Sequence, residues 1–129
     1  LAGSAMATAA IRATLSTTLL DVDYERMIPL ASRWADGVAA SIDLHELTWS
    51  VQQLGCRAEY WFSPLPVNGA DAAGAVDDEL DAFMHLWALN RGILMTPFHN
   101  MALLSPEHTV TDVDHHTQVF ASALAALTQ

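Results

Sequence analysis

The segment Thr96-Pro97-Phe98-His99-Asn100-Met101 holds the residues whose types and spacing are best suited to chemistry. An aromatic ring (Phe98), an imidazole (His99) and a carboxamide (Asn100) follow one another between two short apolar runs. Loops between sheet elements are where a rigid scaffold presents binding groups. The three side chains are therefore candidate pocket residues. A polar turn in which His99 is satisfied locally explains the pattern equally well.

Six histidines raise the question of a metal site, but their spacing does not favour one. His115 and His116 are adjacent, so on a helix their side chains point about 100° apart. The chain has a single cysteine, Cys56, and no HExxH, P-loop, GxGxxG or GxSxG pattern. Because Asp112 and Asp114 lie beside them, the two histidines are expected on a solvated helix face. No metal site is predicted.

The charge balance excludes two classes of partner. Fifteen acidic residues face five basic ones, which gives a net charge of -10. Nucleic acids and anionic membrane surfaces both require clustered positive charge on the protein. All five basic residues are arginines, so the chain has no lysine amine for Schiff-base chemistry.

Length and composition fit a single domain that belongs to a larger protein. A chain of 129 residues forms one compact domain, and 52% hydrophobic residues are enough for a core. Only 16% of the residues are charged, which suggests apolar surface meant for another domain or subunit. The lone cysteine and the lack of a signal sequence or membrane span favour the cytoplasm. The start at Leu1 suggests a fragment.

Hydrophobic periodicity predicts helices separated by short strands. We expect helices over residues 3–20, 22–43, 78–91 and from 111 to the end, and strands over 48–51, 57–62, 93–96 and 101–105, with a loop from 63 to 74. The predicted fold class is therefore α+β, with a small sheet of short strands covered by helices on one face.

Three details of the helices can be predicted more closely. The core should include Met27, Ile28, Trp34, Val38, Trp87 and Phe120, which fall on apolar stripes. Pro29 should kink the second helix or mark a start near Ile28. Asp77 is a suitable cap for the third helix, and Thr111 followed by Asp114 resembles a capping box for the last.

Four motifs, in this order, resemble the C-terminal small domain of the class III aminotransferases. They are Leu1-Ala2-Gly3-Ser4-Ala5-Met6-Ala7, Leu54-Gly55-Cys56-Arg57-Ala58-Glu59-Tyr60, Leu89-Asn90-Arg91-Gly92-Ile93-Leu94-Met95-Thr96-Pro97 and Leu104-Ser105-Pro106-Glu107-His108-Thr109. The resemblance covers essentially the whole chain and is strongest to the glutamate-semialdehyde aminomutase-like branch.

The resemblance implies a fold type I enzyme that uses pyridoxal phosphate to move an amino group between an amino compound and a carbonyl compound. The lysine that binds the cofactor would lie upstream, in a large domain that is absent here. Residues 1–129 would be one domain, whose helix over 1–20 leads from that large domain. The partners implied are the large domain, a second subunit of a homodimer and a small amino substrate.

The resemblance also places site residues. Phe98, His99 and Asn100 would line the substrate pocket, and Arg57 would supply a positive group, although a surface ion pair is an equally good role for Arg57. Ala102 stands near the position where many members carry a carboxylate-binding arginine. The chain by itself is expected to be inactive and to bind no cofactor covalently. The alternative is a non-enzymatic acidic domain that binds another protein.

Overall fold

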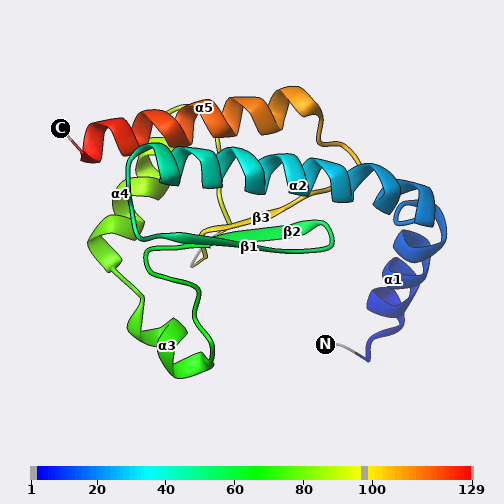
Figure 1. Cartoon of the computed structure of the whole chain (residues 1–129). Helices are drawn as coiled ribbons and strands as arrows, with labels where there is room; N and C mark the ends of the chain where they lie inside the picture. The colour runs from blue at the N-terminus through cyan, green and yellow to red at the C-terminus, as the bar shows by residue number, and fades with distance from the viewer. Residues whose placement is uncertain (1–2, 97–98, 129) are drawn as a thin grey trace.

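The fold is a three-stranded antiparallel sheet covered by helices on one face (Figure 1). The computed structural model describes residues 3–96 and 99–128. Its elements are α1 (Ala5–Thr17), α2 (Asp21–Leu44), β1 (Ser50–Leu54), β2 (Arg57–Trp61), α3 (Gly69–Gly74), α4 (Asp78–Leu89), β3 (Met101–Leu103) and α5 (Val110–Leu127). The strand order is β1-β2-β3. The α+β prediction is confirmed.

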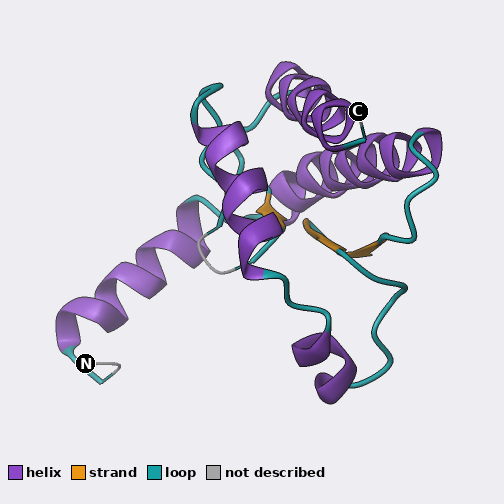
Figure 2. Ribbon diagram, turned by 90° about the vertical axis from the view of Figure 1, so that its left-hand side faces the viewer, coloured by secondary structure: helices purple, strands orange, loops and turns teal. Residues whose placement is uncertain are grey.

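The helices divide into a covering layer and two outlying elements. Helices α2 and α5 run side by side over one face of the sheet, while α3 lies beyond the opposite face (Figure 1). Figure 2 shows α1 projecting away from the body, and none of its residues is buried. No helix in the described ranges is both long and apolar enough to cross a membrane.

Helix α2 provides most of the predicted core. Met27, Trp34 and Val38 are buried on its inner face, as the periodicity predicts. Ile28, at the margin of that stripe, is 41% exposed, so this part of the prediction is wrong. The helix begins at Asp21 and continues past Pro29, so a start near Ile28 is also wrong. Phe120 is buried in the same core, and Trp87 packs against it partly buried.

A close approach joins α2 to α5. A Cβ atom added to Gly37 would lie 2.6 Å from Thr117 Oγ1 and 2.7 Å from Thr117 Cγ2, so only glycine fits there without a shift. One turn earlier, the Arg33 guanidinium forms two hydrogen bonds to the Asp114 carboxylate, at 2.6 and 3.0 Å. Together these contacts set the spacing and register of the two helices.

Three local predictions are corrected by the structure. Thr109, with Asp112, forms the capping box of α5, not Thr111 with Asp114. The predicted loop contains α3, whose first turn is capped by Asn68. Residues 93–96 form no strand, since Gly92 turns the chain at φ 83° and the Ile93 amide donates to the Ala88 carbonyl at the end of α4.

His116 is buried, contrary to the expected solvated face. It is 8% exposed, and its ring lies 4.9 Å from the Trp34 ring and 6.1 Å from the Phe120 ring. Its neighbour His115 is exposed and donates from Nε2 to the Arg91 carbonyl. Burial, and secondly the nearby His115, lowers the pKa of His116 from 6.5 to about 4. The ring is therefore neutral at pH 7.

We predict that stability falls as the pH drops from about 6.5 to about 4. In this window the unfolded chain binds a proton at His116 while the folded chain does not, so the loss should reach on the order of 3 kcal/mol. Urea unfolding measured along this pH range tests it. His116→Phe should flatten the dependence, whereas the adjacent control His115→Gln should retain it. An unchanged slope in His116→Phe would contradict the assignment.

Candidate functional site

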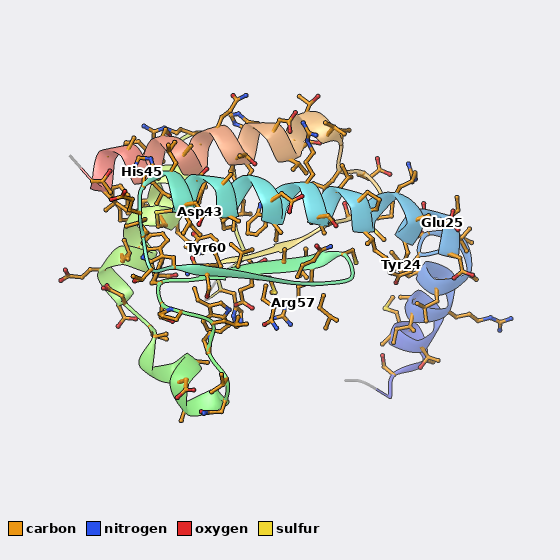
Figure 3. The ribbon with its side chains drawn as sticks, in the orientation of Figure 1. Tyr24, Glu25, Asp43, His45, Arg57 and Tyr60 are labelled. Atoms are coloured by element: carbon orange, nitrogen blue, oxygen red, sulfur yellow. The ribbon has the colours of Figure 1, made fainter. Side chains whose placement is uncertain are left out.

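Strand β2 carries different chemistry on its two faces because side chains alternate along a strand. Ala58 and Tyr60 are buried beneath the helices. Arg57, Glu59 and Trp61 alternate with them and therefore point to the face that α2 and α5 leave uncovered. Figure 3 shows Tyr60 between the sheet and α2, and Arg57 on the opposite side. Polar groups on the uncovered face are the candidate site.

One carboxylate connects two of the predicted site residues. Arg57 Nη2 lies 2.7 Å from Glu59 Oε2, and His99 Nδ1 lies 3.3 Å from Glu59 Oε1. The Glu59 side chain is only 10% exposed, whereas that of Arg57 is 48% exposed. Glu59 is not among the site residues predicted from the sequence. The signal was present, because an acidic residue between Ala58 and Tyr60 in an apolar strand needs a partner.

Asn100 is held beside this cluster by the sheet. Its main-chain carbonyl accepts a hydrogen bond from the Tyr60 amide at 3.0 Å, which extends the β2–β3 pairing by one residue. Its side-chain Oδ1 is buried and has no hydrogen-bond partner among the described residues. Phe98, the third residue predicted in this loop, lies outside the described residues. The structure thus brings Arg57 and His99 together at Glu59. Asn100 lies opposite Tyr60 and lines the same cavity as Glu59 and His99.

A cavity of about 400 Å³ opens next to the cluster. Glu59 and Trp61 form one wall, and His99 and Asn100 form another. The remaining polar lining consists of carboxylates at the start of α4: Asp77, Asp78 and Asp81. Four acidic side chains around one cavity create a negative potential that attracts cationic groups and repels phosphate.

Tyr60 also borders this cavity, but it is not a base. Burial, and secondly the Asp81 carboxylate, raises the pKa of its hydroxyl well above the ordinary range. The phenol therefore stays protonated at neutral pH. It can contribute packing and a hydrogen-bond donor.

The chemistry of the described cavity does not fit pyridoxal phosphate. The sequence has no lysine to bind the aldehyde. The cavity is lined by carboxylates, which disfavour a phosphate group. Within residues 3–96 and 99–128, no group of three or more His, Cys, Asp or Glu side chains is placed to hold a metal ion.

Sequence and fold relate the chain to a known group of enzymes. It is 30% identical over 128 residues to a glutamate-1-semialdehyde 2,1-aminomutase from Opitutus terrae, covering 98% of this chain and 30% of the relative. The structure matches a glutamate-1-semialdehyde aminomutase from Pseudomonas aeruginosa with TM-score 0.92 and 39% identity. The chain is related over its whole length to glutamate-1-semialdehyde aminomutases.

The structural match to the Pseudomonas enzyme shows which part of these enzymes this chain corresponds to. It covers 97% of this chain and 28% of the Pseudomonas enzyme, so the chain spans less than a third of its relatives, and its fold is that of their C-terminal small domain. The same enzyme, as a lysine-to-alanine variant, has been solved in complex with PMP. An omega-transaminase from Sphaerobacter thermophilus shares the fold at 24% identity and TM-score 0.69. No family model matches the chain.

We predict an asymmetry between the two partners of the Arg57–Glu59 ion pair. Arg57→Met leaves the largely buried Glu59 carboxylate without its main partner, which should cost roughly 1–3 kcal/mol of unfolding free energy. Glu59→Gln leaves a half-exposed arginine that water can solvate, so the loss should stay within about 1 kcal/mol. Urea unfolding at pH 7 measures both. Equal losses, or a larger loss for Glu59→Gln, would show that Glu59 is not held by Arg57.

Proposed function

We propose that this chain forms one wall of the substrate cleft in a pyridoxal-phosphate-dependent aminomutase or aminotransferase. The observation that supports this most strongly is the whole-length match to glutamate-1-semialdehyde aminomutases, at 39% identity with TM-score 0.92. The polar cluster on the uncovered sheet face supports it independently. A domain whose polar groups face away from its own core is suited to complete a site with another domain.

The proposed division of labour follows from what the chain lacks. Pyridoxal phosphate supplies the electron sink for amino-group chemistry. Residues outside this chain would bind it, since the sequence has no lysine and the cavity beside Glu59 is lined by carboxylates. The domain would instead orient the substrate and exclude water, which are positioning roles.

The charges of the site indicate which end of a substrate it would meet. The acidic cavity would attract an ammonium group, and the His99 ring and the Asn100 carboxamide can each form a hydrogen bond to it or to a neighbouring hydroxyl. The Glu59 contacts hold Arg57 and His99 in place. Phe98, which precedes His99 in the sequence, would provide an apolar contact to the substrate.

We further propose that the complete protein is a cytoplasmic homodimer of the class III type. Its large domain would precede residues 1–20 in the sequence. The exposed apolar side chains of α1, among them Met6, Ile11 and Leu15, are consistent with a helix that packs against another part of the protein.

We predict that His99→Ala combined with Asn100→Ala lowers kcat/KM of the full-length enzyme tenfold or more, about 1.4 kcal/mol of transition-state stabilisation. The reacting substrate would lose the hydrogen bonds that these two side chains form. Steady-state kinetics and thermal unfolding should be measured together, and the melting temperature should stay nearly unchanged.

A matched pair of changes controls for the loss of an imidazole and an amide elsewhere. His45→Ala with Asn90→Ala removes the same groups from the end of α2 and the end of α4, away from the cavity. This control should retain kcat/KM. If the two double variants behave alike, or if activity falls only in step with stability, His99 and Asn100 are structural residues.

We predict that the 129-residue chain alone is inactive and does not bind pyridoxal phosphate through a side chain, because it has no lysine. Borohydride reduction with added cofactor, followed by intact mass measurement, should give no stoichiometric adduct other than at the terminal amine. An adduct at any other position would contradict this expectation. A full-length protein without aminomutase or transaminase activity would favour the alternative, an acidic domain that binds another protein.

A further inference from the structure

The outer edge of β3 has no neighbouring strand among the described residues. The register with β2 pairs Ala58 with Ala102, and the Leu104 amide donates to the Cys56 carbonyl. In an antiparallel pair, hydrogen-bonded and non-hydrogen-bonded positions alternate. The amides and carbonyls of Met101 and Leu103 therefore point away from β2, toward the free edge.

A gap lies along this edge, between β3 and the unpaired segment 92–96. Its volume is about 340 Å³, and residues 92–96 and 101–104 both line it. Within the described residues, no backbone hydrogen bond crosses from one segment to the other. The Ile93 amide donates to the Ala88 carbonyl, and among residues 3–96 and 99–128 the amides of Leu94 and Met95 have no backbone partner. Unpaired main-chain groups thus line the gap from both sides.

The floor of the gap belongs to the core. Trp34, Val113 and His116 reach it from α2 and α5. His116 is only 8% exposed, and its Nδ1 has no hydrogen-bond partner among the described residues. A buried imidazole without a partner is costly, and so is an open apolar edge strand, which invites association with other chains. A chain segment lying in the gap would relieve both features.

We propose that an extended segment of the polypeptide outside this chain lies in the gap and adds a fourth strand to β3. The inference rests on the proposed function only in requiring a longer polypeptide, and the chain spans just 28% of the length of its structural relatives. Main-chain hydrogen bonds to Met101 and Leu103 would provide affinity. The side chains of the added strand that face the helices would be small or apolar, because Trp34 and Val113 form the floor.

Amide hydrogen exchange at single-residue resolution tests the proposal in the full-length protein. In the full-length protein, the amides of Met101 and Leu103 should exchange roughly 100-fold or more slowly than in the 129-residue chain. The reason is that hydrogen bonds to an added strand open only by local unfolding. The Ala102 amide faces β2 and serves as an internal control that is protected in both. Hydrogen exchange does not depend on enzymatic activity. A negative result would therefore contradict the added strand without contradicting the proposed function.

A pair of variants adds a second readout. Leu103→Pro removes the main-chain N–H that points to the free edge. Leu103→Ala keeps this N–H and only shortens an exposed side chain. In the full-length protein, Leu103→Pro should abolish the protection of Met101, and Leu103→Ala should leave it intact. If Leu103→Pro does not fold, exchange in the unmodified protein remains decisive.

Three results would overturn the proposal. Fast exchange of Met101 and Leu103 in the full-length protein would show a solvated edge. Equal protection in the 129-residue chain, together with slow exchange of Leu94 and Met95, would show that segment 92–96 itself closes on β3. Protection that disappears on dilution would assign the gap to a second copy of the protein.

Discussion

The close contact between α2 and α5 is the constraint on which the rest of the domain depends. At Gly37 the backbone of α2 meets the Thr117 side chain at a distance that leaves no room for a Cβ atom. The two helices can therefore form one layer, and that layer covers one face of the sheet. Trp34 connects the helix layer to the sheet, since its ring lies 4.9 Å from the His116 ring on α5 and 6.2 Å from the Tyr60 ring on β2.

Covering only one face divides the side chains of β2 into two sets with different roles. Ala58 and Tyr60 complete the core, and the residues between them cannot do so because side chains alternate along a strand. Glu59 is nevertheless largely buried, so it requires the partners that it finds in Arg57 and His99. The same alternation that builds the core thus places a charged cluster on the uncovered face, next to a cavity.

The sequence predicted α1, α2, α4 and α5, the approximate positions of β1, β2 and β3, and the fold class, because apolar periodicity records which side of each element is buried. It could not choose between alternatives with the same pattern. Two T-x-x-D sequences overlap at the start of α5, and the structure uses Thr109 with Asp112. Asp114 is then free to bind Arg33 on α2. That choice depends on a contact between helices 81 positions apart, which no local pattern contains.

The candidate site was predicted in part for a similar reason. The loop at His99 and Asn100 and the arginine at position 57 were identified by residue type, but Glu59, which links them, was not. His116 was misplaced because a histidine between acidic neighbours is typical of a helix surface. Its burial follows instead from the Trp34 and Phe120 rings that enclose it. Long-range packing, rather than local composition, decides the environment of an ionisable side chain.

The charge of the domain is consistent with a site shared between two domains. An active site that holds an anionic cofactor and an amino substrate needs positive groups near the phosphate and negative groups near the ammonium. This chain has fifteen acidic residues and no lysine, and its cavity beside Glu59 is lined by aspartates. It is therefore suited to the ammonium end alone. Under the proposed function, another domain would supply the positive groups near the phosphate and would face the polar side of this sheet.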